Sequence, residues 1–119
     1  MKRLIDAFWN SVRAFQRLAG SEAAFQQELI LLLIAIPVGW LVAASWVGYA
    51  LLIAAILFVI LVEVLNTGIE ATCNAVNREF NIDIQLAKDC GSLAVLISFV
   101  LAGGVWLFAI LERLFGAPV

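Results

Sequence analysis

Five polar side chains at helical spacing carry the clearest chemical pattern in this sequence of 119 residues. They place one polar stripe on one side of a helix: Glu63, Asn66, Thr67, Glu70 and Asn74. The stripe begins inside an apolar segment, and a carboxylate at the middle of a bilayer costs at least about 2.5 kcal/mol. Glu63 and Glu70 therefore predict a site that binds a cation, a proton or a neighbouring chain. Solvation among lipid head groups is a simpler explanation for Glu70 than for the deeper Glu63.

Two further polar clusters lie beside apolar segments. Glu22 and Gln26 share a helical face shortly before the first apolar segment. The second cluster lies at the start of the last apolar segment and consists of Gln85, Lys88, Asp89 and Ser92. Lys88 could bind phosphate as a point charge, although charges snorkelling from a helix start explain it equally well. If Glu22 lies beside Glu70, the pair suits a hard cation, because Mg²⁺ is often held by one or two carboxylates plus phosphate oxygens.

The scarcity of charge indicates which elements position these residues. Only 13% of the residues are charged and 65% are apolar, whereas a soluble domain carries roughly 25% charge. This composition excludes an ordinary soluble globule, a disordered chain and a nucleic-acid binder, and the absence of His excludes imidazole chemistry. The uncharged residues 29–62 would form about 51 Å of helix, which is too long for one crossing and predicts a break near residues 45–49. We predict membrane spans at residues 29–46, 47–72 and 88–112.

Residues 1–20 form a different kind of segment. Apolar side chains alternate at helical spacing with a cationic polar face, which predicts an amphipathic helix lying on the membrane surface. Gly20 should end this helix and Ser21 should cap the next. Lys and Arg are concentrated in this segment and in the second connection, at Arg78 and Lys88, so the positive-inside rule places both in the cytoplasm. Ser98 and Ala102 should permit close helix packing.

Three stretches together resemble the prokaryotic diacylglycerol kinase family. Residues 62–71 read VEVLNTGIEA, which is similar to the family signature of Glu, Leu-Asn-Ser/Thr, a small residue and Ile-Glu. Residues 22–28, EAAFQQE, resemble the segment before the family's first span. Residues 87–95, AKDCGSLAV, resemble its Ala-Lys-Asp start of the third span. Their order and spacing match, and the resemblance covers nearly the whole chain.

The resemblance implies an all-α integral membrane protein with an N-terminal surface helix and three transmembrane helices. It further implies one membrane kinase domain over residues 1–119 and a homotrimer of the bacterial inner membrane with sites shared between protomers. Such enzymes transfer the γ-phosphate of MgATP to the hydroxyl of diacylglycerol and form phosphatidic acid.

The resemblance also implies roles for individual residues. Glu63 is the general base, and Glu22 and Glu70 bind the Mg²⁺ that accompanies ATP. The expected nucleotide contacts are Arg3, Asn10, Glu22, Glu70, Glu79, Asn81, Lys88 and Asp89. The expected lipid contacts are Arg3, Glu28, Glu63, Asn66 and Ser92.

The sequence departs from the family pattern at a few positions. Asn74 stands where an Asp usually follows the second Glu, and Phe80 and Asn81 stand where a Tyr-His pair is frequent. Leu86 replaces a basic residue, and Asn10 occupies a position where an aromatic can occur. These differences concern the nucleotide contacts of the connection and leave the core acids intact.

Three alternatives stay open at this point. A kinase of the same fold that acts on undecaprenol is the nearest. A small proton-coupled transporter that uses Glu63 would have four spans and an acid in its first span, neither of which this sequence predicts. A non-enzymatic subunit of a membrane assembly would keep its function when Glu63 is replaced by Gln.

Overall fold

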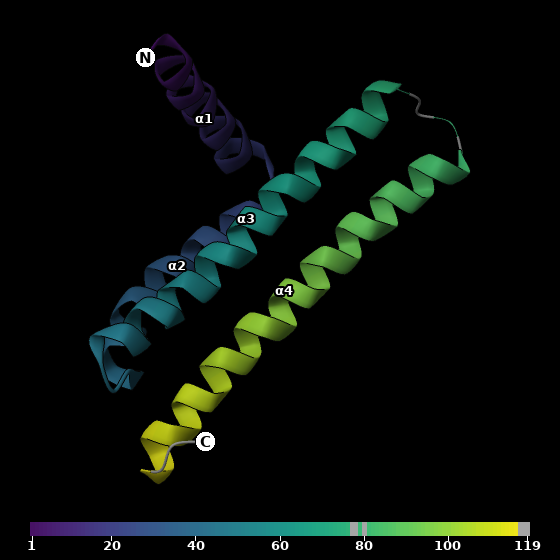
Figure 1. Ribbon diagram of the computed structural model, residues 1–119. Helices are drawn as coiled ribbons and strands as arrows, with labels where there is room; N and C mark the ends of the chain where they lie inside the picture. The colour runs from purple at the N-terminus through teal and green to yellow at the C-terminus, as the bar shows by residue number, and fades with distance from the viewer. Residues whose placement is uncertain (77–78, 80, 117–119) are drawn as a thin grey trace.

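The computed structural model describes residues 1–76, 79 and 81–116, and within them the chain forms four α-helices (Figure 1). They are α1 (Lys2–Ser21), α2 (Ala23–Val42), α3 (Trp46–Val76) and α4 (Ile82–Phe115). By length and composition, α2, α3 and α4 are each able to cross a membrane. This agrees with the prediction of three spans, and it explains the many large apolar side chains that remain exposed along them.

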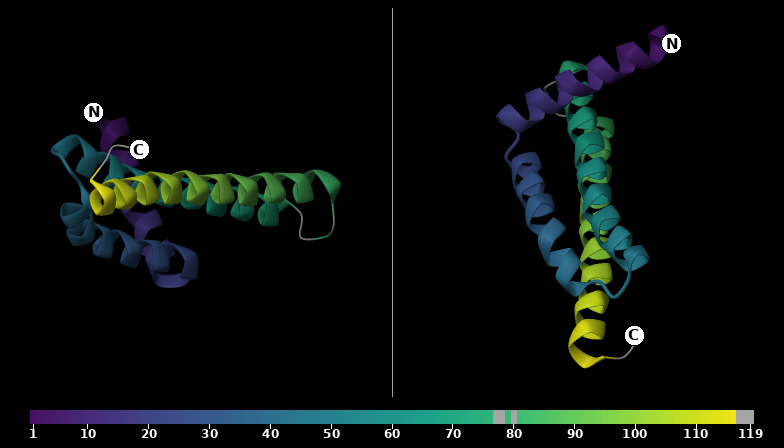
Figure 2. Two further views of the ribbon diagram at one scale, coloured as in Figure 1. Left: turned by 90° about the horizontal axis from the view of Figure 1, so that it is seen from below. Right: turned by 90° about the vertical axis from the view of Figure 1, so that its left-hand side faces the viewer.

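Helix α3 lies at the centre of the bundle and packs against both α2 and α4. Helices α2, α3 and α4 run in alternating directions, and α1 lies across one end of the bundle, where it packs on α2 (Figure 2). The end that carries α1 also carries the connection between α3 and α4, while the α2–α3 link and the last turn of α4 lie at the other end (Figures 1 and 2). A protein with three spans places its connections in this way.

The break between α1 and α2 differs from the prediction. Ser21 does not cap α2: it is the last residue of α1, and its hydroxyl donates to the carbonyl of Arg17 at 2.7 Å. Ser21 thus belongs to the preceding helix, whereas an N-cap residue lies outside the helix with non-helical backbone angles. Glu22 is the residue between the helices, with extended backbone angles (φ −103°, ψ 110°), and no side-chain cap bond is present there.

The starts of α3 and α4 are capped by side chains that sequence patterns can indicate. Ser45 Oγ accepts from the Gly48 N–H at 3.0 Å, so α3 begins at Trp46 and the break falls at residues 43–45. Asn81 Oδ1 accepts from the Asp83 N–H at 2.9 Å, so α4 begins at Ile82, six residues before the predicted start of the third membrane span. Arg78 and Phe80, on which two sequence arguments rest, lie outside the described residues.

The centre of the bundle is closely packed. Val59 is only 1% exposed and packs with Ala55 and Ala102. Ser98, which is 0% exposed, precedes Ala102 by one turn on the buried side of α4, as expected for small residues that let helices pack closely. The Trp106 indole donates to the carbonyl of Leu52 at 3.0 Å, tying α4 to α3.

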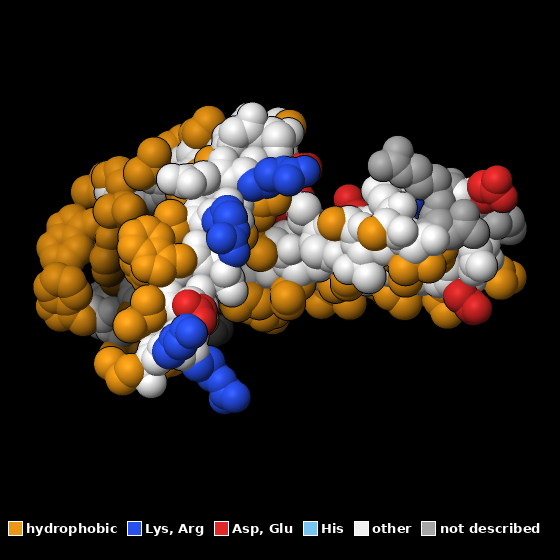
Figure 3. Space-filling view, turned by 90° about the horizontal axis from the view of Figure 1, so that it is seen from above, with side chains coloured by type: hydrophobic (Ala, Val, Ile, Leu, Met, Phe, Trp, Pro, Cys, Tyr) orange, Lys and Arg blue, Asp and Glu red, His pale blue; other side chains and the backbone are white. Residues whose placement is uncertain are grey.

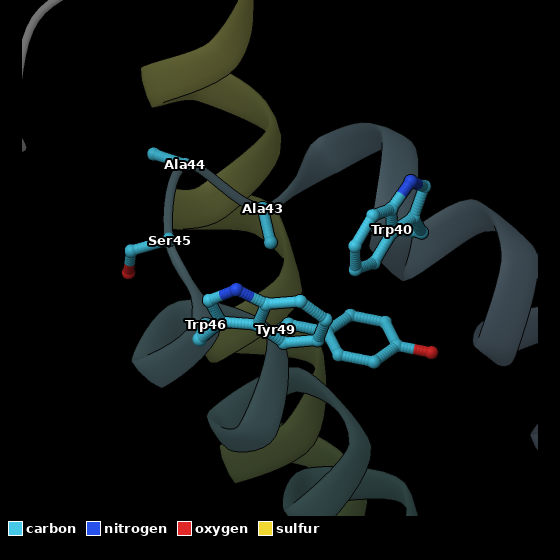
Figure 4. A pocket seen from close by; sticks show the side chains of 6 residues that line it. All are labelled: Trp40, Ala43, Ala44, Ser45, Trp46 and Tyr49. Atoms are coloured by element: carbon cyan, nitrogen blue, oxygen red, sulfur yellow. The ribbon is translucent and has the colours of Figure 1, made fainter.

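The α2–α3 link carries an aromatic cluster of Trp40, Trp46 and Tyr49 (Figure 4). Their rings contact one another edge to face, with centroids 4.8 to 6.4 Å apart, beside a cavity of about 250 Å³. The Tyr49 hydroxyl also donates to the carbonyl of Ile36 at 2.8 Å. Trp and Tyr favour the boundary between membrane and water, so this cluster suits the end of a span.

Candidate active site

Glu63 is a charged residue in apolar surroundings. It lies on the buried stripe of α3, one turn from Val59, and only 9% of it is exposed. Its backbone carbonyl accepts the Thr67 hydroxyl at 3.0 Å. Because a carboxylate buried among apolar side chains needs a partner, Glu63 marks the centre of the candidate site.

Glu28 is a second buried carboxylate, and it faces the first. It lies on α2, is 5% exposed, and lies within electrostatic range of Glu63 across the helix interface. One carboxylate oxygen, Oε1, is buried without a hydrogen-bond partner. The family resemblance assigned Glu28 to the lipid site but gave no indication of this pairing. The spacing of Glu28 from the buried Phe25 and Ala35 was the available signal, because three and seven residues place all three on one helical face.

Asn66 links Glu63 to Glu70. Its amide donates to Glu70 Oε1 at 3.2 Å and also interacts with the Glu63 carboxylate. The side-chain oxygen of Asn66, Oδ1, is buried without a hydrogen-bond partner, and it lies against Gly91 of α4. A Cβ atom at position 91 would overlap Asn66 Oδ1, so the glycine creates the space in which the amide lies.

Glu22 reaches the site from the α1–α2 elbow. The Phe15 and Phe25 rings meet edge to face across this elbow with centroids 5.5 Å apart, and Leu18 is buried beside them. The Gln26 side-chain amide adds a hydrogen bond to the Ala19 carbonyl at 2.8 Å. The exposed Glu22 carboxylate lies within electrostatic range of Glu63. We call the two exposed acids, Glu22 and Glu70, the mouth of the candidate site, and its buried acids are Glu28 and Glu63.

The start of α4 brings a cation near this mouth. Lys88 Nζ donates to Asn74 Oδ1 at 3.0 Å, one turn beyond Glu70 on α3. Asp89 and Ser92 are exposed on the following turn. Asn74 therefore provides a neutral acceptor where the family pattern has an Asp.

The remaining predicted nucleotide contacts lie on α1 and shortly before α4. Arg3 and Asn10 are exposed on α1, and Asn10 Oδ1 accepts from the Arg13 guanidinium at 2.5 Å. The Lys and Arg side chains of α1 gather on one side of the molecule (Figure 3). Glu79 is exposed in the α3–α4 connection, and the Asn81 side chain caps α4. In a single copy of the chain, the structure brings together Glu22, Glu28, Glu63, Asn66 and Glu70. Among the described contacts of residues 1–76 and 81–116, none joins Arg3, Asn10 or Asn81 to these acids.

The acids do not form a complete metal site by themselves. Within residues 1–76, 79 and 81–116, no three side chains of His, Cys, Asp or Glu group closely enough to hold a metal ion. Two exposed carboxylates nevertheless match the protein share of a typical Mg²⁺ site, in which nucleotide phosphates and water supply the other ligands. Glu22 and Glu70 fit that description.

Comparison with known proteins identifies similar chains. The family model described as prokaryotic diacylglycerol kinase matches residues 9–110. A diacylglycerol kinase of Pseudomonas aeruginosa is 36% identical over 106 residues, which cover 89% of this chain and 86% of the relative. The diacylglycerol kinase of Escherichia coli K12 is 34% identical over 104 residues, covering 87% of this chain and 85% of the relative. A third relative with this name, from Haemophilus influenzae, is 28% identical over 106 residues.

Proposed function

This chain belongs to the prokaryotic diacylglycerol kinase family, and from that premise we propose that it transfers the γ-phosphate of ATP to the hydroxyl of 1,2-diacylglycerol, forming phosphatidic acid. One structural observation carries the assignment of the site. Glu63 is buried at one end of a membrane-type bundle, beside Glu28 and within reach of the exposed Glu22 and Glu70. The arrangement offers a sheltered base next to an exposed acidic mouth.

Glu63 acts as the general base in this proposal. The hydroxyl oxygen of the lipid attacks the γ-phosphorus, the bond from phosphorus to the departing ADP oxygen breaks, and the hydroxyl proton passes to the Glu63 carboxylate. A base must lie within hydrogen-bond reach of the proton that it takes. Asn66 positions the group, since its amide interacts with Glu63 and donates to Glu70.

Glu22 and Glu70 hold the magnesium of MgATP at the mouth of the site. When bound, Mg²⁺ neutralises charge on the phosphate oxygens, which is the main requirement of phosphoryl transfer. Lys88 adds a positive charge one turn farther out, and its bond to Asn74 keeps the ammonium on the α3 side of α4. Asp89 contacts the nucleotide, and Ser92 with Glu28 shapes the lipid site.

The membrane placement follows from the same premise. We place α2, α3 and α4 across the bacterial inner membrane, with the N-terminus and the α3–α4 connection in the cytoplasm. Helix α1 lies on the membrane surface, with its exposed Lys and Arg side chains toward anionic head groups. The chain assembles as a homotrimer, so that nucleotide contacts distant within one copy, such as Arg3 and Asn10, are supplied at sites shared between protomers.

A lipid panel tests the proposal. Purified protein in detergent micelles is supplied with ATP, Mg²⁺ and either diacylglycerol or undecaprenol, and the phosphorylated lipid is quantified. We expect phosphatidic acid from diacylglycerol, and no product when magnesium is chelated. Faster phosphorylation of undecaprenol would replace the proposed substrate, and ATP-dependent phosphorylation of neither lipid would refute the kinase assignment.

A further inference from the structure

The aromatic cluster at the α2–α3 link borders a cavity that the catalytic scheme does not use. The cavity has a volume of about 250 Å³, and the three rings of the cluster line it together with Ala43, Ala44 and Ser45 (Figure 4). Tyr49 precedes Glu63 by fourteen residues on α3, which corresponds to about 21 Å of helix. A ligand in this cavity is therefore separate from the acids of the candidate site.

The three rings are arranged like the walls of a corner. Trp40 comes from the last turn of α2, and Trp46 and Tyr49 come from the first turn of α3. Their ring planes are inclined to one another by 62° to 89°. The face of an aromatic ring carries the negative part of its quadrupole, so rings that line a cavity from several directions attract a cation inside it.

The backbone adds a second attraction for a cation. Helix α2 ends at this cavity, where the Ala43 N–H donates to the Gly39 carbonyl at 2.8 Å. The carbonyls that follow in this last turn have no amide donor within the helix, and they give the helix end a partial negative charge. The six side chains that line the cavity within the described residues are all uncharged, so none of them repels a cation.

A neighbouring cavity adds a partner for an anion. It has a volume of about 330 Å³, shares Ala44 with the first cavity, and is also lined by Glu112 and Arg113 of α4. The exposed guanidinium of Arg113 has the donor geometry that phosphate oxygens bind. Glu112 and Arg113 present one charge of each sign, so the two adjoining cavities together suit a zwitterion.

The head group of a phospholipid fits this arrangement. Trp and Tyr favour the boundary between membrane and water, where lipid head groups lie. At about 30 Å³ for each heavy atom, the volume that a water molecule takes in the liquid, a trimethylammonium group with one methylene carbon needs about 150 Å³. This is less than the volume of about 250 Å³ beside the rings. Because a short ethylene bridge joins the nitrogen to the phosphate, adjoining cavities suit the two charged groups of one lipid.

We propose that the aromatic cluster binds the ammonium head group of a zwitterionic phospholipid, and that Arg113 contacts the phosphate of the same lipid. This lipid is not the one that is phosphorylated, because it lies at the opposite end of the bundle from the acids (Figure 1). Bound there, it connects the ends of α2, α3 and α4 on the side of the membrane away from the α3–α4 connection.

Saturation-transfer NMR tests the choice of head group. Purified protein in maltoside micelles is mixed with phosphatidylcholine, or with phosphatidylglycerol that has the same acyl chains, and the aromatic protons of the protein are irradiated. Transfer to the N-methyl protons of phosphatidylcholine should exceed transfer to the head-group protons of phosphatidylglycerol by about fivefold or more. Tetramethylammonium chloride should compete for the site, whereas sodium chloride at the same ionic strength should not. Equal transfer to both head groups, or no competition by tetramethylammonium, would overturn the proposal.

Variants test the residues. Trp46→Leu and Trp40→Leu should each weaken phosphatidylcholine binding about fivefold, and Trp46→Phe should retain most of it because Phe also offers an aromatic face. Both tryptophans are more than half exposed, so their removal leaves the packed core intact. Trp9→Leu, which removes an exposed tryptophan from α1, is the matched control and should leave binding unchanged. Arg113→Gln should weaken the binding of phosphatidylcholine but not that of tetramethylammonium.

Two further results would overturn the proposal. One is an unchanged affinity for phosphatidylcholine in both Trp46→Leu and Trp40→Leu, and the other is an equal loss of affinity in Trp9→Leu. The binding measurement uses neither ATP nor diacylglycerol, so its outcome is independent of the kinase assignment.

Discussion

Replacing Gly91 by Ala should damage the active site through Asn66 without touching any acid directly. A Cβ atom at position 91 overlaps Asn66 Oδ1, so the amide must move away from Glu70. Losing a hydrogen bond to a charged group costs about 1.5–3 kcal/mol, which predicts a fall in kcat/KM of about 10- to 100-fold. Overpacking costs about 1–3 kcal/mol of stability, and the better helix propensity of Ala returns about 1 kcal/mol. The packing change by itself should therefore lower the free energy of unfolding by no more than about 2 kcal/mol, in addition to the cost of the lost hydrogen bond.

The assay is lipid phosphorylation in micelles alongside thermal denaturation of each variant. Gly104→Ala is the matched control, because it lies on the same helix and a Cβ there meets nothing within 4 Å. A double-mutant cycle isolates the mechanism: in an Asn66→Ala background, Gly91→Ala should have little further effect on either measurement. Two results would show that the contact between position 91 and Asn66 does not position the site. One is that Gly91→Ala reduces activity equally in the wild-type and Asn66→Ala backgrounds, and the other is that it has no effect in the wild type.

Three other outcomes follow from contacts in the structure. Glu70→Gln should raise the Mg²⁺ concentration needed for half-maximal nucleotide binding about tenfold, whereas Asp83→Asn should not; equal effects would remove Glu70 from the metal site. Asn74→Asp should turn the bond to Lys88 into an ion pair and raise the thermal denaturation temperature at low salt; a gain that persists at high salt would contradict the electrostatic explanation. Tyr49→Phe should lower stability by about 1 kcal/mol with unchanged turnover, because it loses one hydrogen bond at the end opposite the acids.

Local periodicity predicts the α3 part of the site from the sequence. Glu63, Asn66 and Glu70 are three and four residues apart, so any helix through them places them on one face, and the structure joins Asn66 to both acids. The three apolar spans are likewise readable, because the uncharged runs exceed the thickness of a membrane.

Contacts between helices are less accessible to sequence reasoning. The pairing of Glu28 with Glu63 depends on how α2 rotates against α3, and no spacing within either helix specifies that rotation. The position of Gly91 beside Asn66 depends in the same way on the register of α4. The cavity beside the aromatic cluster was not predicted, because a cavity is a property of several packed surfaces.

Helix ends and membrane spans need not coincide where hydropathy and helicity diverge. Helix α4 begins at Ile82 although Asp83, Lys88 and Asp89 make its first turns polar. A helix can continue beyond the part that crosses a membrane, so the span at residues 88–112 stays a prediction within the longer helix. The Asn81 cap was the signal for the true start. At Ser21 a residue type that favours helix starts is instead the last residue of the preceding helix, where its hydroxyl donates to the Arg17 carbonyl.

The central claim is that the buried Glu63 is the base of a lipid kinase, and the Glu63→Gln variant tests it most directly. Turnover of diacylglycerol and the affinity for MgATP are measured on the same preparation, with Glu112→Gln, a half-buried acid in the last two turns of α4, as the control. We predict that Glu63→Gln loses turnover almost completely while it binds MgATP with affinity close to that of the wild type. Turnover near that of the wild type would contradict the account.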